Sequence, residues 1–135
     1  MLDQRFAASV HIMTLMAYHE GELMTSEFLA EGIRTNPTVV RRLVAKLVEA
    51  RLLESFKGKS GGVRIAKPPK EISLQDIYQA VSGKALIHGR QSEPHKQCVV
   101  SCSMKKIFGE VASGLETASM GYLAKIKLSD LAAKV

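Results

Sequence analysis

The strongest structural signals lie in residues 33–66, IRTNPTVVRRLVAKLVEARLLESFKGKSGGVRIA. Asn36 followed by Pro37 predicts the start of a helix, because Asn caps helix N-termini and Pro fits the first helical position, where its missing N–H costs nothing. Apolar side chains then recur at helical spacing and predict a buried stripe made of Val40, Leu43, Val44 and Leu47. The outer faces of this helix, expected over residues 38–53, carry Thr38, Arg41, Arg42, Ala45 and Lys46.

A β-hairpin is expected directly after this helix. Residues 53–56 and 62–66 have the pattern of two short strands, and the glycines around the tip supply the positive φ angles that a tight hairpin needs. Pro68 and Pro69 end the second strand. A basic hairpin after a basic helix predicts a wing that lies along the DNA backbone or the minor groove, and an ordinary hairpin with a solubilising tip is the alternative. The tip residues are Lys57, Gly58, Lys59, Ser60 and Gly61.

Two amphipathic helices are expected before residue 34. The first covers residues 5–19, and its apolar stripe consists of Phe6, Val10, Met13 and Ala17, widened by Ile12 and Met16. The second covers residues 26–33, is capped by Thr25 or Ser26, and turns Phe28, Leu29 and Ile33 inward. Two helices joined by a short turn form a helix–turn–helix. The predicted fold class is therefore mainly α with a small β-hairpin, as a winged helix–turn–helix domain.

Positive charge is concentrated in the same segment. The chain has a net charge of +6, but ten basic and two acidic residues give residues 34–70 a net charge of +8. Such clustering is expected of a surface that contacts phosphates, although a crowded, solvated basic face is the alternative. A recognition helix presents its N-terminal residues to base edges in the major groove. We therefore predict contacts with double-stranded DNA from Asn36, Pro37, Thr38, Arg41, Arg42 and Lys46 of the helix and from Lys57, Lys59, Ser60 and Gly61 of the wing.

Several other classes of protein are disfavoured. No apolar run approaches the roughly 18 residues of a membrane span, and no separate apolar signal segment opens the chain, so a cytoplasmic protein is expected. The run GKSGG lacks the helix that would follow a phosphate-binding loop, because it forms the hairpin tip. The four histidines are not spaced with acids or cysteines in a hydrolytic arrangement, so we expect no enzyme and no catalytic residue.

Residues 33–66, together with GGVRIAKPP and the following EISLQDIYQAVSG, resemble the Rrf2 family of bacterial transcription regulators. Members of this family include an iron–sulfur regulator, a nitric-oxide sensor and a regulator of cysteine metabolism. Arg51 departs from the family pattern, which usually has Gly between the third helix and the wing. The resemblance implies a homodimer with a long C-terminal helix that crosses to the partner, preceded by a sensor region. The expected divisions are residues 1–82 for DNA binding, 83–98 for the sensor loop and 99–135 for the dimerisation helix.

The C-terminal residues are consistent with this implied division. Ser73 is the expected N-cap of a helix that places Leu74, Ile77 and Val81 on one face. A second helix is expected from about Val99, and its apolar residues follow the alternating spacing of four and three that helices packed at a shallow angle show. This predicted dimer seam, for which an intramolecular core is the alternative, consists of Met104, Phe108, Val111, Leu115, Ala118 and Tyr122.

Cys98 and Cys102 are the predicted sensor residues. The resemblance implies three cysteines in this loop for cluster-binding members, whereas this chain has two in all, and Ala8 stands where the nitric-oxide sensor supplies an acid. We therefore expect no cofactor and no metal, although an iron–sulfur cluster and a metal held by His95, Cys98 and Cys102 are alternatives. The preferred hypothesis is a thiol redox switch, favoured by the helix N-terminus and nearby lysines. Inert cysteines and the sensing of another small ligand also stay open.

The sequence thus predicts a homodimeric, sequence-specific DNA-binding regulator, expected to act as a repressor on a palindromic operator. The rival function is a protein–protein adaptor that keeps the winged fold without binding DNA. Salt dependence separates the two, because affinity for DNA falls steeply with salt according to the number of phosphate contacts.

Overall fold

The computed structural model describes residues 4–82 and 93–135. Residues 83–92 of the predicted sensor loop lie outside the described residues. In chain order the elements are α1 (Gln4–Tyr18), α2 (Ser26–Ile33), α3 (Pro37–Glu49), β1 (Leu53–Phe56), β2 (Gly62–Ile65), the 3-10 helix η1 (Pro69–Glu71), α4 (Leu74–Val81), α5 (Val99–Ala124) and α6 (Leu128–Ala132). This mainly helical chain with one antiparallel hairpin has the predicted fold class.

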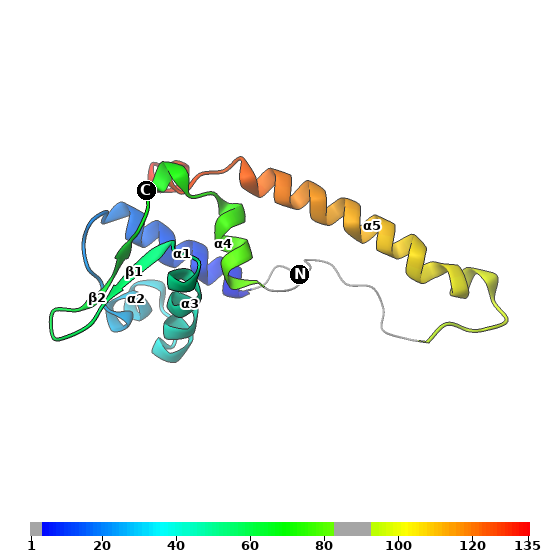
Figure 1. Cartoon of the computed structure of the whole chain (residues 1–135), viewed down its shortest axis with the longest axis horizontal. Coiled ribbons are helices and arrows are strands. Elements are labelled where there is room, and N and C mark those ends of the chain that lie inside the picture. Colours follow the sequence, from blue (N-terminus) through cyan, green and yellow to red (C-terminus); the bar gives the residue numbers. More distant parts are fainter. Residues whose placement is uncertain (1–3, 83–92) are drawn as a thin grey trace.

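The elements form a body and an arm. Helices α1 to α4, the hairpin and α6 pack together, whereas α5 extends away from them over most of its length (Figure 1). Helix α1 lies in the centre of the body and packs against α2, α3, α4, α6 and β2. The fully buried side chains come from all of these helices and include Ile12, Leu29, Leu47, Ile77 and Leu128.

The buried face of α1 is displaced from the predicted stripe. Met13 and Ala17 are buried as predicted, but Phe6 and Val10 are only half-buried and pack at the edge of the core. The ring of Phe6 lies edge-on to that of Tyr78 in α4, with their centroids 5.3 Å apart. Ile12, predicted to widen the stripe, is completely buried. The centre of the stripe therefore shifts towards the C-terminal half of the helix, where α1 has neighbours on several sides.

The prediction that Phe28 faces inward is wrong. Its side chain is 48% exposed, while Leu29, Ala30 and Ile33 are buried. A short helix buries residues one and four positions apart on one side, and Leu29 and Ile33 fulfil this spacing against α3. Phe28 lies next to this face, and its backbone N–H donates to the Oγ1 of Thr25, which is the N-cap of α2.

Helix α3 is shorter than predicted, because it ends at Glu49 rather than continuing to Leu53. Arg51 adopts a left-handed conformation with φ of 64°. The N–H of Arg51 donates to the carbonyl of Val48, and the N–H of Leu52 donates to that of Leu47. These two bonds are those of a Schellman motif, in which a left-handed residue, usually Gly, ends the helix. The turn leads directly into β1.

The hairpin pairs β1 with β2 from Leu53–Ile65 to Phe56–Gly62. Strand β2 ends at Ile65, one residue before its predicted end. Met24 forms a further antiparallel bridge to Val63 through two backbone hydrogen bonds of 2.8 Å. Gly62 has φ of 154°, and a Cβ there would lie 2.6 Å from the carbonyl oxygen of Met24. A glycine is therefore required where the chain before α2 runs antiparallel beside β2.

The last residues of the chain return to the body. Ser73 is the N-cap of α4 and forms a capping box with Asp76, as its position in the sequence suggests. The N–H of Leu74 donates to the carbonyl of Ile126, and the N–H of Leu128 donates to that of Ile72. Leu128 is completely buried. The segment 99–135, assigned as a whole to dimerisation, therefore consists of the arm α5 and of α6, which belongs to the core of the body.

Candidate nucleic-acid interface

The start of α3 presents most of the predicted recognition residues to solvent. The Oδ1 of Asn36 accepts a hydrogen bond of 2.8 Å from the N–H of Thr38, and Pro37 occupies the first turn. This cap fixes the beginning of the helix while Val40, Leu43, Val44 and Leu47 fill the core. Asn36, Pro37, Thr38, Arg41 and Arg42 are exposed, and Lys46, one turn further along, is half-buried.

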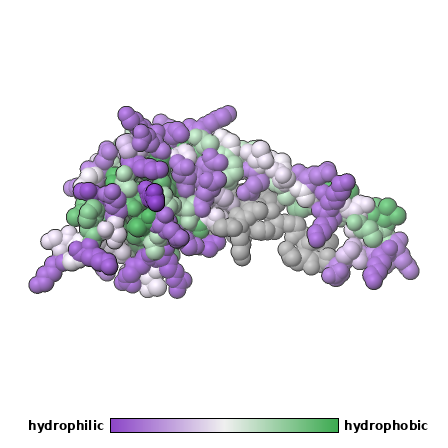
Figure 2. All heavy atoms as spheres, viewed as in Figure 1, coloured by the Kyte–Doolittle hydropathy of each residue, from purple (hydrophilic) through white to green (hydrophobic). Residues whose placement is uncertain are grey.

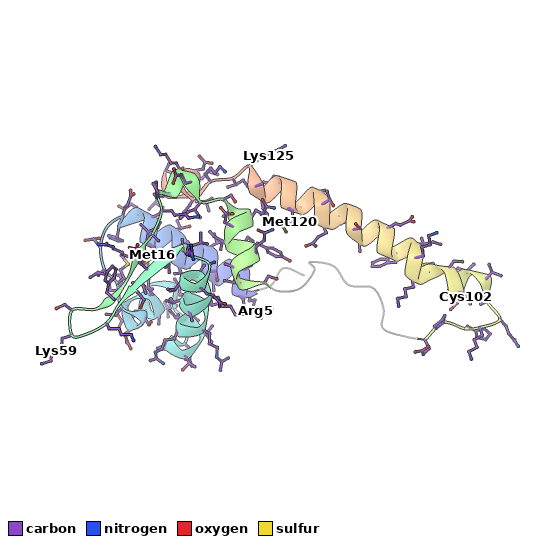
Figure 3. All side chains as sticks on the ribbon, viewed as in Figure 1. Arg5, Met16, Lys59, Cys102, Met120 and Lys125 are labelled. Carbon is purple, nitrogen blue, oxygen red and sulfur yellow. The ribbon has the colours of Figure 1, made fainter. Side chains whose placement is uncertain are left out.

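The tip of the hairpin carries the predicted wing residues. Lys57, Lys59 and Ser60 are exposed, Gly61 is half-buried, and the N–H of Gly61 donates to the carbonyl of Gly58 across the turn. Lys59 lies at the end of the hairpin that is farthest from the body (Figure 3). Helix α3 and the tip project on the same side of the body, opposite α6 (Figure 1). The structure therefore brings the two predicted sets of basic residues to one side.

Hydrophilic side chains surround this side of the molecule. In the space-filling view they project from the lower edge of the body and from the hairpin tip (Figure 2). Of the exposed basic residues in the segment 34–70, Arg41, Arg42, Lys57 and Lys59 contribute to this surface, whereas Lys70 lies in η1, which packs against α6 on the opposite side. A surface of this charge attracts a polyanion over a distance of about a Debye length.

Two arginines on these elements are held by acids that the sequence prediction passed over. The Nη2 of Arg41 lies 3.5 Å from the Oε1 of Glu27 in α2. The Nε of Arg64 lies 3.3 Å from the Oε2 of Glu54, and its guanidinium stacks 4.7 Å from the ring centre of Phe56. Glu54 and Arg64 are direct partners in the hairpin register. The hairpin register could have revealed this second pair, whereas the Glu27 contact depends on how α2 packs on α3.

The arm α5 has no buried residue. Of the predicted seam, Met104, Val111, Leu115, Ala118 and Tyr122 are exposed, whereas Phe108 is half-buried. Ile107, which was not predicted, is 49% exposed and lies three and four residues from Met104 and Val111. The arm therefore presents a continuous apolar stripe to solvent along its length, which a single chain leaves uncovered.

The two cysteines lie at the beginning of α5, at the end of the arm that is remote from the body (Figure 3). Both are exposed and neither forms a disulfide. Cys98 is the N-cap, and its Sγ accepts a hydrogen bond of 3.4 Å from the N–H of Ser101. The thiol of Cys102 lies 3.5 Å from the carbonyl oxygen of His95 and donates to it. The cysteine pair is thus part of the local hydrogen bonding that starts the helix.

These residues do not fit a four-thiolate iron–sulfur cluster. The chain contains two cysteines, and each sulfur is already directed at a backbone group. Among residues 4–82 and 93–135, no group of three or more His, Cys, Asp or Glu side chains is arranged to hold a metal ion. Over the same residues, no helix combines the length and the apolar character that crossing a bilayer requires.

Comparison with known proteins gives a consistent result. Residues 2–134 match the Rrf2 family, described as iron-dependent transcriptional regulators. The chain is 30% identical over 131 residues, 97% of its length and 96% of the relative's, to the "Putative HTH-type transcriptional regulator YwnA" of Bacillus subtilis (strain 168). A crystal structure of "a putative DNA binding protein" is 31% identical and has a TM-score of 0.76, with 94% of this chain and 97% of that chain covered.

A third match supports the fold. The structure of CymR (YrzC), described as the global cysteine regulator of B. subtilis, has a TM-score of 0.75 at 20% identity and covers 100% of this chain and 98% of its own. The matching family is one of transcriptional regulators, which are not enzymes, in agreement with the prediction of a regulator rather than an enzyme. The chain belongs to the Rrf2 family of transcriptional regulators.

Proposed function

We propose that this protein binds a palindromic DNA operator as a homodimer and represses transcription there. The observation that carries the proposal is the single surface on which the exposed N-terminal half of α3 and the lysines of the hairpin tip lie together. Arg41 and Arg42 would read base edges in the major groove, and Lys57 and Lys59 would contact the backbone beside it. A dimer bound across a promoter would exclude other proteins from that DNA.

The binding experiment uses fluorescence anisotropy with a duplex that the wild-type protein selects from a random library. We expect the logarithm of the affinity to fall linearly with the logarithm of salt concentration. Replacing Arg41 or Arg42 by Ala is expected to relax base preference, whereas replacing Lys57 and Lys59 by Ala weakens binding to all sequences alike.

The matched control removes the same charge elsewhere. Lys125 lies at the end of α5, on the other side of the body from Lys59 (Figure 3), and Lys134 is in the C-terminal tail. Replacing both by Ala is expected to leave affinity and the salt slope nearly unchanged. Binding that is indifferent to salt and to the four basic residues of α3 and the hairpin would favour the adaptor function instead.

The proposed dimer covers the apolar stripe of α5. A single copy would leave this stripe in water along a 26-residue helix, and a second copy of the same helix has a complementary face by symmetry. Val111→Glu and Leu115→Glu are expected to yield monomers in sedimentation analysis, because each places charge in the seam. Ser113→Glu is the control, since Ser113 is two residues from each and projects from another side of the helix. Dimers that survive all three substitutions would place the interface elsewhere.

We also propose that the cysteine pair makes the protein responsive to peroxide. The peroxide oxidises one thiol to a sulfenic acid and releases water, and the second thiol then displaces a second water to form a disulfide. The Cys98 sulfur can no longer serve the N–H of Ser101 as it does in the reduced form, so the first turn of α5 would be rearranged. Peroxide is expected to change operator affinity in the wild type and not in the Cys98→Ser, Cys102→Ser double variant. An identical response in both proteins would exclude this mechanism.

A further inference from the structure

An acidic side chain lies within the most basic side of the molecule. Glu27, in the first turn of α2, contacts Arg41 on the outer face of α3 at 3.5 Å. The two side chains are 68% and 56% exposed, so both are accessible to a ligand. Of the ten basic residues in the segment 34–70, all of which the structure describes, Arg41 and Arg64 are the two with an ion-pair partner.

Stability of the fold explains this contact poorly. An exposed ion pair contributes little to folding, because water screens the charges and two long side chains lose rotamer freedom. An acid in the first turn of a helix interacts favourably with the helix dipole, but this effect does not require Arg41. Against these small gains, a carboxylate on a surface that approaches phosphates lowers the attraction for any DNA.

The contact has a clear consequence for recognition. A guanidinium has five N–H donors, and the carboxylate engages one end of it, which leaves donors for a base edge. Holding the side chain in one place removes part of the entropy that Arg41 would lose on binding. At the same time, the negative charge of Glu27 weakens the contact of Arg41 with a phosphate of non-operator DNA. Such repulsion is one way in which a protein rejects an incorrect partner.

We propose that Glu27 is a specificity-determining residue, which positions Arg41 for a base and weakens its contact with non-operator DNA. This inference rests on the proposed DNA-binding function. It predicts that Glu27 affects the ratio of the two affinities, operator over scrambled duplex, more than it affects either affinity alone.

Glu31 provides a matched control for this test. It is exposed, lies one helical turn after Glu27 in α2, and lines the same shallow hollow between α2 and α3. No ion pair joins Glu31 to a described residue. Glu27→Gln and Glu31→Gln therefore remove the same charge from nearly the same place, and only the first removes the contact with Arg41.

The experiment measures both variants against two duplexes, the one selected by the wild type and a scrambled duplex of equal composition. For Glu27→Gln we expect affinity for the scrambled duplex to rise, and the operator-to-scrambled ratio to fall about 5- to 10-fold, the size of one base contact. For Glu31→Gln we expect both affinities to rise alike and the ratio to stay within about 2-fold of wild type. In the Arg41→Ala background, Glu27→Gln is expected to leave the ratio unchanged.

Two other outcomes of this experiment would contradict the inference, and one of them would also contradict the proposed function. If wild type prefers its selected duplex and Glu27→Gln keeps the wild-type ratio, or shifts it also in the Arg41→Ala background, then Glu27 does not act through Arg41 and this inference is wrong. If the wild type shows no preference for any duplex, the proposed function fails together with the inference. Circular dichroism melting establishes that the Gln variants are folded, because Gln keeps the size and helix propensity of Glu.

Discussion

Two arginines of the body adopt a backbone conformation that favours glycine. Arg34 follows α2 with φ of 56°, and Arg51 follows α3 with φ of 64°. Each ends a helix with paired hydrogen bonds to the carbonyls of the last turn. A left-handed conformation costs a non-glycine residue roughly 1–2 kcal/mol. Arg34 precedes the cap of α3 and Arg51 follows its last turn, so the two strained residues lie at the two ends of the predicted recognition helix.

We expect Arg51→Gly to stabilise the fold and to weaken DNA binding. The relief of backbone strain exceeds the extra entropy of glycine in the unfolded chain, which gives a net gain of about 1 kcal/mol, or a rise in Tm of about 4 °C. Arg51→Lys is the control, because it keeps the charge and the strain. Urea unfolding and anisotropy measure the two effects. A destabilised Gly variant would show that the Arg51 side chain makes a contact worth more than the strain.

Two buried serines should respond to alanine in opposite directions. Ser9 in α1 is completely buried, and within the described residues its Oγ has no hydrogen-bond partner. Ser73 is almost as deeply buried, but its Oγ accepts from the N–H of Asp76 in the capping box of α4. We expect Ser9→Ala to stabilise by up to about 1 kcal/mol and Ser73→Ala to destabilise by about 1 kcal/mol. Urea unfolding of both variants tests the difference, and a loss of stability in Ser9→Ala would reveal a partner for its hydroxyl.

At the level of single elements, α3 and the hairpin were the most predictable parts of the fold. The start of α3 and the tip of the hairpin are set by local chemistry, namely the cap at Asn36 and the glycines of the tip, which the sequence displays directly. The exposure of Phe28 and the bridge from Met24 to Val63 depend on how distant segments pack. The early end of α3 was not predicted, because Arg51 adopts the left-handed conformation that is typical of glycine although it is not a glycine.

Two substitutions of Asn36, the N-cap of α3, separate an effect on the stability of the fold from an effect on DNA affinity. Asn36→Ala removes the acceptor for the N–H of Thr38 and is expected to cost about 1 kcal/mol of stability. Asn36→Asp keeps an acceptor there and adds a charge that suits the helix dipole, so stability is expected to hold. The same charge would face the DNA, and we expect affinity to fall about 5- to 10-fold. Urea unfolding and anisotropy give the two values. An Asp variant that binds as wild type does would mean that the start of α3 is not near phosphate.

At the level of the whole molecule, the root of the arm is fixed to the DNA-binding body. The backbone bonds that join Ile72 and Leu74 to the segment after α5 are 2.8 and 2.9 Å long, and α6 then enters the core. Ile72 lies three residues after Pro69, which follows the hairpin, and Leu74 is the first residue of α4. The short stretch 72–74 therefore links the hairpin to α4 and, through these hydrogen bonds, to the end of α5. The position of two recognition helices in the proposed dimer is therefore determined by how the two arms cross.

The glycines of α5 test how closely the arms approach. Gly114 and Gly121 lie three or four residues from Ala118 of the seam, whereas Gly109 has Lys105, Lys106, Ala112 and Ser113 at those spacings. Apart from the neighbouring backbone of the helix itself, a Cβ at any of the three would meet no atom of the described residues within 4 Å. Each Gly→Ala substitution is thus expected to stabilise α5 by about 1 kcal/mol in monomer and dimer alike, so that this gain cancels from the dissociation constant.

Because this gain cancels, any change in the dissociation constant reports contact between the substituted residue and the partner helix. If the arms cross closely beside Ala118, Gly114→Ala and Gly121→Ala each place two extra methyl groups in a symmetric interface, at a cost of about 1–3 kcal/mol. We therefore expect dimer dissociation constants at least about tenfold above wild type for these two variants. For Gly109→Ala we expect no change. Sedimentation over a range of concentrations measures all three, and equal constants for the three variants would mean that the arms are held apart by the larger side chains of the seam.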